Sequence, residues 1–230
     1  MRNILKNELN NTDTAHNFWN SEWSQNTKQT EWKIPDYEVI KVAKKLKKNL
    51  KILDLGSGIG RHSLLLAQMG HQVFATDASK NGITILKNNA SSNGLKIDVK
   101  QSKMTSLAYE DNKFDHILSW NVIYHGNEEI ILKTIREIKR VLKINGTFHF
   151  TMLPKDRLML YPYKRNGKEI SKNTWISEVE QEDKTHPHYF CDYNDLIELF
   201  KGFEFFFLNK LKYEKPNSIY WHLFARLIKK

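Results

Sequence analysis

The stretch ILDLGSGIGRH, residues 52–62, decides the fold of this chain. Its apolar start is typical of a buried strand in a parallel sheet. Gly56, Gly58 and Gly60 follow at alternate positions and allow a tight turn in which the backbone can approach a ligand where a Cβ atom would clash. The apolar run at residues 63–69 predicts a helix whose first amides point back into that turn. The stretch therefore predicts a strand-to-helix turn that cradles a nucleotide.

The glycine spacing argues against a dinucleotide ligand. A dinucleotide fingerprint is G-x-G-x-x-G, whose third glycine packs the helix on the strand, whereas this chain has G-x-G-x-G and places Arg61 at that position. With Asp54 two residues before the first glycine, the string D-x-G-x-G-x-G resembles motif I of the class I S-adenosylmethionine-dependent methyltransferases. This resemblance implies a Rossmann-like α/β fold and S-adenosyl-L-methionine as the cofactor.

A second apolar run, Gln72–Asp77, ends in a carboxylate. It follows the glycine turn by about twenty residues, where nucleotide-binding folds place an acid that accepts hydrogen bonds from both ribose hydroxyls. We therefore expect Asp77 to bind the ribose. The alternative is that Asp77 caps a helix beginning at Ala78, since Asp is a favoured N-cap residue.

Composition limits the class of protein. The chain has 230 residues, of which 40% are hydrophobic, which fits one sizeable core with an embellishment better than two full domains. Its single cysteine, Cys191, excludes an internal disulfide. It contains no apolar run of about eighteen residues, and its polar start lacks a signal-peptide core. We expect a soluble, cytoplasmic protein, a monomer or homodimer, without a membrane segment.

The formal net charge of +10 raises nucleic acid as a possible partner, because a basic face attracts phosphate. The lysines are scattered, however, and the dense clusters at residues 44–48 and 229–230 are typical of solvated helix faces and tails. An N-P-P-Y-like string and a Pro-Cys nucleophile are also absent. These observations argue against base methylation in nucleic acid.

The rest of the chain alternates strands and helices. Strands are expected near residues 52–55, 72–77, 97–101, 114–120 and 146–153, with helices between them, including an amphipathic one at Glu128–Leu142. This order predicts a parallel sheet covered on both faces. Aromatic-rich runs at residues 202–208 and 219–226 predict a C-terminal antiparallel hairpin. The ending resembles class I methyltransferases, which implies a seven-stranded, mostly parallel sheet with one antiparallel strand.

Three longer strings resemble the tellurite-resistance-type and related small-molecule methyltransferases. They are GSGIGRHSLLLAQMGHQVFATDAS (56–79), VLKINGTFHF (141–150) and HPHYFCDYNDLIELFKGFEF (186–205). The resemblance covers residues 51–230 and implies methyl transfer to a small-molecule acceptor. Two alternatives remain open: methylation of RNA or another macromolecule, and a non-catalytic protein that binds S-adenosylmethionine or a dinucleotide.

One position departs from the family pattern. The family commonly has an acidic residue after the third strand, as in "GDM", which accepts a hydrogen bond from the adenine amine; here the string is Ser102-Lys103-Met104. Lys103 cannot accept that bond. The adenine is then expected to lie against backbone groups of Lys103 and Met104, the Met104 side chain, and apolar residues such as Ile83.

Two segments are expected to flank the cofactor and the acceptor. Residues 1–50 form an expected N-terminal helical lid, in which Trp19 and Trp23 lie on one helical face; the alternative is ordinary packing of that helix on the sheet. Residues 154–192 form a long insertion after the fifth strand, where loops line the ligand crevice, and are expected to shape the acceptor pocket. Arg157 and Tyr161 are among the side chains this insertion offers.

Histidines near strand ends are candidates for a general base. His125 is the first candidate, followed by His188 and His222, and Tyr124 is grouped with them as a catalytic residue. His186-Pro187-His188 with Cys191 lacks the spacing of a zinc site, so no metal is expected. The complete set expected to bind the cofactor is Trp19, Trp23, Asp54, Gly56, Ser57, Gly58, Gly60, Arg61, Asp77, Ala78, Lys103, Met104, Ser119 and Trp120.

Overall fold

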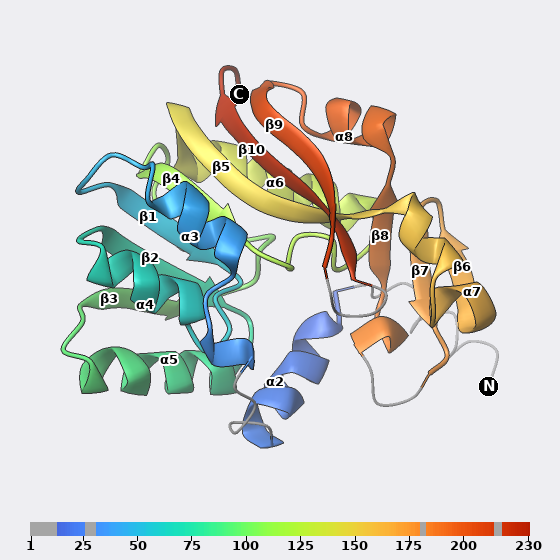
Figure 1. Ribbon diagram of the computed structural model, residues 1–230, viewed down its shortest axis with the longest axis horizontal. Coiled ribbons are helices and arrows are strands. Elements are labelled where there is room, and N and C mark those ends of the chain that lie inside the picture. Colours follow the sequence, from blue (N-terminus) through green and yellow to red (C-terminus); the bar gives the residue numbers. More distant parts are fainter. Residues whose placement is uncertain (1–12, 26–30, 180–182, 214–217) are drawn as a thin grey trace.

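The computed structural model describes residues 13–25, 31–179, 183–213 and 218–230. Its centre is a sheet of seven strands in the order β3-β2-β1-β4-β5-β10-β9, and β10 is the strand that runs against its neighbours (Figure 1). This confirms the predicted seven-stranded sheet with one antiparallel strand. The strands are β1 (Lys51–Leu55), β2 (Gln72–Asp77), β3 (Ile97–Gln101), β4 (Phe114–Ser119), β5 (Leu142–Pro154), β9 (Phe203–Lys212) and β10 (Ile219–Leu227).

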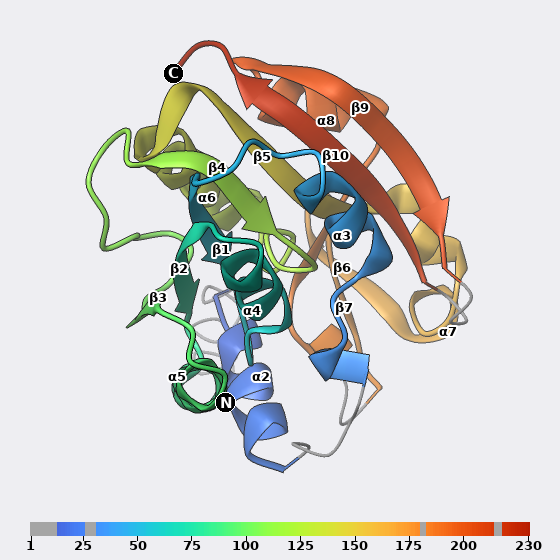
Figure 2. The ribbon, with the colours of Figure 1, turned by 60° about the vertical axis from the view of Figure 1, so that its left-hand side comes forward.

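Helices cover both faces of this sheet, as the alternating pattern predicts. On one face, α3 (Tyr37–Ala43) and α4 (Arg61–Gln68) pack on β1 and β4 through a small apolar core that includes Val39, Leu66 and Ile52 (Figure 2). On the other face, α6 (Glu128–Val141) and α8 (Tyr193–Leu199) pack on the larger core. A further helix, α5 (Lys80–Ser92), packs against β2 and β3.

The expected helix at residues 128–142 is confirmed as α6, and its sequence explains its limits. Asn127 caps it by accepting a hydrogen bond from the Ile130 amide at 3.1 Å. Acidic residues occupy its first turn and basic residues its last, which suits the helix dipole. Ile131, Ile135 and Ile138 are buried at helical spacing and face the sheet.

The insertion after β5 builds structure of its own. Residues 147–152 of β5 pair with β10, whereas Leu153 and Pro154 at its end pair with β8 (His188–Cys191). An antiparallel extension, β7 (Thr174–Ser177) and β6 (Gly167–Ser171), continues from β8, so the described sheet has ten strands. Short helices accompany these strands: η2 (Lys155–Met159), α7 (Tyr163–Asn166) and η3 (Asp183–Thr185).

The described N-terminal residues form α2 (Ala15–Gln25) and η1 (Glu31–Lys33). Helix α2 packs against α5 and also contacts η3 of the insertion (Figures 1 and 2). The N-terminal segment and the insertion after β5, both expected to flank the ligands, are therefore in contact with each other. Within the described residues, no helix combines the length and apolarity needed to cross a lipid bilayer.

Candidate active site

A cavity of about 930 Å³ lies at the carboxyl ends of the central strands. Its walls include residues that directly follow β1, β2 and β4, which is where α/β sheets bind their ligands. Helix α2 and η1 contribute aromatic rings to it, and η2 and η3 close the side opposite β2 and β3. Its size is within the range of small-molecule sites, about 300–1,000 Å³.

The glycine turn forms one wall of the cavity. Gly56 and Gly58 have φ angles of +74° and +52°, a backbone region that disfavours side chains. A Cβ atom on Gly56 would lie 2.3 Å from the Val122 side chain, and one on Gly58 would lie 3.3 Å from the Trp23 ring. Glycine is therefore required both by the turn and by its neighbours, and the backbone stays open to the cavity.

Asp77 lies beside this turn and lines the cavity. Its Oδ2 accepts a hydrogen bond from the Gly58 amide and its Oδ1 from the Ser79 amide, both at 2.8 Å. A carboxylate has about four acceptor sites, so these bonds leave capacity for a ligand's hydroxyls. Burial raises the pKa of Asp77.

The helix-cap alternative for Asp77 is wrong. Helix α5 begins at Lys80, and its N-cap is Ser79, whose Oγ accepts a hydrogen bond from the Gly82 amide at 3.0 Å. Asp77 is the last residue of β2, and it fixes the glycine turn to the end of that strand.

Three residues expected to bind the cofactor do not line the cavity: Asp54, Gly60 and Ser119. Asp54 accepts a hydrogen bond from Ser63 Oγ at 2.5 Å, and burial raises its pKa to about 6. Ser119 Oγ donates to the Leu55 carbonyl at 3.0 Å. Gly60 is the N-cap of α4, and a Cβ atom there would lie 2.1 Å from Leu86. Asp54 and Ser119 turn their side chains into the protein, and Gly60 leaves room for Leu86, so all three support the turn from the side away from the cavity.

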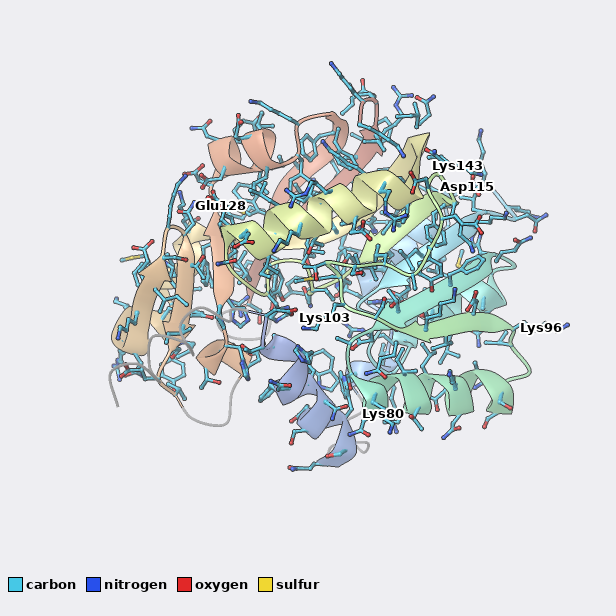
Figure 3. All side chains as sticks on the ribbon, turned by 180° about the vertical axis from the view of Figure 1, so that it is seen from behind. Lys80, Lys96, Lys103, Asp115, Glu128 and Lys143 are labelled. Carbon is cyan, nitrogen blue, oxygen red and sulfur yellow. The ribbon has the colours of Figure 1, made fainter. Side chains whose placement is uncertain are left out.

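The expected adenine end of the cavity contains Lys103 and Met104. Lys103 Nζ lies 2.8 Å from Asp13 Oδ2, and Asp13 also lines the cavity. Lys103 extends toward the N-terminal segment beside α2 (Figure 3). The apolar residue expected beside the adenine, Ile83 of α5, is buried and does not line the cavity. Ile59 lines the cavity instead.

Three tryptophans form an aromatic cover over the glycine turn. Trp19 and Trp23 are stacked with ring centroids 5.3 Å apart, and Trp32 contacts both edge-on at 5.4 and 5.6 Å. Trp23 is buried against Gly58 and Gly82. All three rings line the cavity, as do the other expected cofactor residues Ser57, Arg61, Ala78 and Trp120.

The far wall holds the candidate catalytic residues. His125 and Tyr124 line the cavity, whereas His188 is buried behind them, with its ring centroid 4.7 Å from that of His125. Burial raises the pKa of Tyr124, so its phenol keeps its proton at neutral pH. The third histidine, His222, does not line the cavity and bonds the Tyr213 hydroxyl at 2.8 Å.

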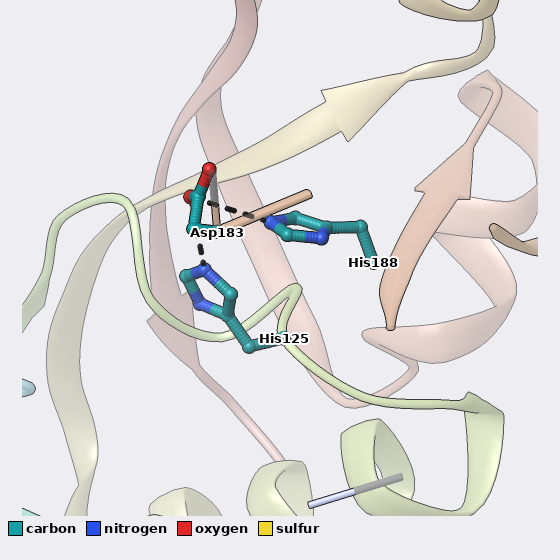
Figure 4. A group of neighbouring side chains, drawn as sticks. All are labelled: His125, Asp183 and His188. Atoms are coloured by element: carbon teal, nitrogen blue, oxygen red, sulfur yellow. Dashed lines mark ion pairs between the residues drawn. The ribbon is translucent and has the colours of Figure 1, made fainter. Parts of the chain in front are cut away.

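Asp183 completes this wall and is not apparent from the sequence. Its Oδ2 lies 3.9 Å from His125 Nε2 and 3.6 Å from His188 Nε2, and its Oδ1 pairs with Lys184 (Figure 4). Burial alone would raise the pKa of Asp183, but the two histidines and Lys184 hold it well below its usual range. We name the set His125, Asp183 and His188 the His–Asp–His cluster. Arg157 and Tyr161 of the insertion line the cavity nearby, as expected.

Comparisons with known proteins find similarity to methyltransferases. The family described as "Methyltransferase domain" matches residues 52–146. The ubiquinone biosynthesis O-methyltransferase of Pelagibacter ubique is 37% identical over 122 residues, which are 53% of this chain and 49% of that protein. The ribosomal protein L11 methyltransferase of Dictyoglomus thermophilum is 31% identical over 143 residues, 59% of this chain and 45% of that protein. The chain thus spans about half the length of these curated relatives.

Solved structures share the fold over most of the chain. A methyltransferase from Methanosarcina mazei has a TM-score of 0.71 at 20% identity, covering 86% of this chain and 100% of that one. A Burkholderia thailandensis 1,6-didemethyltoxoflavin-N1-methyltransferase, solved with S-adenosylhomocysteine, has a TM-score of 0.71 at 17% identity, covering 93% and 87%. TehB from Haemophilus influenzae has a TM-score of 0.63 at 21% identity, covering 90% and 66%. Residues 52–146 thus match the methyltransferase domain family, and the described chain shares the fold of these solved methyltransferases.

Proposed function

We propose that this protein transfers a methyl group from S-adenosylmethionine to a small-molecule acceptor and releases S-adenosylhomocysteine. The observation that carries this proposal is the arrangement of Asp77 and the open glycine backbone at one end of a cavity whose other end is polar. One end has the groups that a nucleoside needs. The other has space and hydrogen-bonding groups for a second molecule.

The residues present fit the cofactor. Asp77 has unused acceptor capacity for the two ribose hydroxyls, and Gly56 and Gly58 line the cavity in a turn where a Cβ atom would collide with Val122 or crowd the Trp23 ring. The adenine would lie by Met104 and Ile59, with the Asp13 carboxylate close to Lys103. Asp13 thus offers the acceptor oxygen that the chain lacks after β3.

When bound, S-adenosylmethionine supplies a methyl group on a positively charged sulfonium. The protein's task is to hold the acceptor in line with that group, and orientation of this kind contributes about 7–11 kcal/mol to lowering a barrier. Trp19, Trp23 and Trp32 cover the cavity and exclude water. The face of Trp19 is also a suitable neighbour for a cation.

The acceptor's reactive atom would face His125 and Tyr124. The protonated Tyr124 hydroxyl can donate a hydrogen bond that orients the acceptor. His125 is the first candidate to interact with the acceptor's proton, because it lines the cavity while His188 is behind it. Arg157, held with its guanidinium 4.6 Å from the Tyr220 ring centroid, adds a positive charge at the same wall.

The segments that enclose the cavity favour a small acceptor over a macromolecule. Helix α2 and η3 contact each other across the cavity, which leaves limited access for a folded macromolecule. The likeness to L11 methyltransferases keeps a protein acceptor as the alternative.

The test is an acceptor screen that measures S-adenosylhomocysteine release from the purified protein. Small phenols, carboxylates, amines and thiols are compared with protein and RNA mixtures, with Asp77→Ala as the inactive control. We expect release with at least one small-molecule class. Release with protein or RNA alone would contradict the small-molecule assignment.

A further inference from the structure

The His–Asp–His cluster has the composition and spacing of a metal site. His125 comes from the loop after β4, Asp183 from η3 and His188 from the start of β8, so the fold brings together residues far apart in the sequence. One ligand atom from each lies within 4.8 Å of the other two (Figure 4). Two imidazoles and one carboxylate are the donor set of many divalent-metal centres.

Both histidine rings are fixed with the same nitrogen turned inward. His125 Nδ1 lies 2.7 Å from the Val122 carbonyl oxygen, and His188 Nδ1 lies 2.8 Å from the His186 carbonyl oxygen. A carbonyl only accepts, so each Nδ1 must carry the proton that it donates. In the neutral rings both Nε2 atoms are then lone-pair donors directed at Asp183. Metal-binding histidines are held in this way by the partners of their other ring nitrogen.

With both rings neutral, the three atoms at the centre of the cluster are all acceptors, so Asp183 stays ionised beside them only when a cation, either a proton on one Nε2 or a metal ion, lies between them. The distances of 3.9 and 3.6 Å from the Nε2 atoms to Asp183 Oδ2 exceed those of a good N–H···O bond, about 2.7–3.2 Å. His125 Nε2 is buried and has no hydrogen-bond partner. Buried polar atoms are normally satisfied, so this arrangement calls for a positive species at the centre.

A divalent cation fits that gap. Tetrahedral zinc with ligands at about 2.0–2.2 Å places its ligand atoms about 3.3 Å apart, so the two Nε2–Oδ2 separations of 3.9 and 3.6 Å would have to shorten by about 0.6 and 0.3 Å. Lys184 neutralises Asp183 Oδ1 and leaves Oδ2 directed at the histidines. His125 and Asp183 line the cavity, so a bound cation would have an open position facing it.

We propose that His125, Asp183 and His188 bind one divalent transition-metal cation, with zinc the best match to two nitrogens and one oxygen. Resting on the proposed function, the open position would take an oxygen atom of the methyl acceptor, which makes a hydroxyl- or carboxylate-bearing acceptor the expected class. The metal would then act on the acceptor in place of His125, because both ring nitrogens of His125 are occupied. The sequence predicts no metal because its short-range spacing does not reveal that Asp183 and His125 join His188.

The test measures metal binding in the absence of any methyl donor. The 230-residue chain is stripped with a chelator and titrated with Zn²⁺ by calorimetry, and the Co²⁺-loaded protein is examined for visible d–d bands. We expect one equivalent of Zn²⁺ and cobalt bands of a nitrogen- and oxygen-ligated site. His188→Ala and Asp183→Asn should each weaken binding at least 100-fold.

His186→Ala is the matched control. His186 is a neighbouring histidine whose side chain bonds Thr14 at 2.9 Å, and its carbonyl, which orients His188, survives the substitution. Zinc affinity should be unchanged in this variant. Absence of stoichiometric binding by the parent protein would overturn the proposal, as would binding that survives in folded His188→Ala or that is lost equally in His186→Ala. Failure of the acceptor screen with zinc binding intact would refute the methyl-transfer function alone.

Discussion

Asp77 gives the clearest single-residue prediction. Each of its oxygens already accepts one backbone amide at 2.8 Å, and each has capacity left for one ribose hydroxyl. Hydrogen bonds to a charged group contribute about 1.5–3 kcal/mol each, so losing two costs about 3–6 kcal/mol of binding free energy. Asp77→Ala should therefore raise the Kd for S-adenosylhomocysteine by about 10² to 10⁴.

The assay is isothermal titration calorimetry of S-adenosylhomocysteine with the parent, Asp77→Ala and Asp77→Asn. Asp77→Asn keeps one oxygen acceptor and should show an intermediate Kd. Asp98→Ala is the matched control, because Asp98 is an exposed carboxylate on the neighbouring strand β3 and does not line the cavity. Thermal unfolding of each variant checks that the glycine turn has survived. A folded Asp77→Ala protein that binds within threefold of the parent would refute the ribose assignment.

Three further predictions concern the turn, the adenine and pH. Gly58→Val should abolish S-adenosylhomocysteine binding in calorimetry, because its side chain would fill the space beside Trp23 at a strained φ; a normal Kd would contradict this. Asp13→Ala should raise the same Kd about tenfold if its carboxylate accepts the adenine amine, and an unchanged Kd would remove Asp13 from the site. The folded pKa of Asp54, about 6, is above the ordinary aspartate value of 3.8, so its ionisation costs stability as pH rises through this range. Asp54→Asn should therefore gain stability on the parent by about 1–1.5 kcal/mol between pH 5 and pH 7 in urea unfolding; a difference that is constant with pH would contradict the raised pKa.

Most of the central sheet could be predicted because its signals are local. The apolar runs that contain Asp54 and end at Asp77 mark strands with largely buried side chains, whereas Asn145-Gly146, just before the expected fifth strand, lies inside β5. The strands of the insertion could not be predicted in the same way. Residues 167–177 are polar with weak alternation, and their pairing depends on β8, which a distant stretch of sequence provides.

The residues of the candidate site also differ in whether local sequence predicts them. The glycine turn and Asp77 could be predicted, since one strand, one turn and the next strand fix their relative positions. Asp13 and Asp183 could not, because Asp13 precedes α2 and Asp183 begins the short helix η3, and both reach the cavity through tertiary packing. Asp54 belongs to the expected cofactor-binding set, but its side chain bonds Ser63 and does not line the cavity, which a motif position does not reveal.

The measurement that tests the central claim most directly is a paired titration of the purified protein with S-adenosylmethionine and with NAD. The glycine turn, with Arg61 where a dinucleotide site has its third glycine, predicts binding of S-adenosylmethionine at one molecule per chain and no binding of NAD. Tight binding of NAD with no binding of S-adenosylmethionine would contradict the assignment of this cavity to a methyl donor.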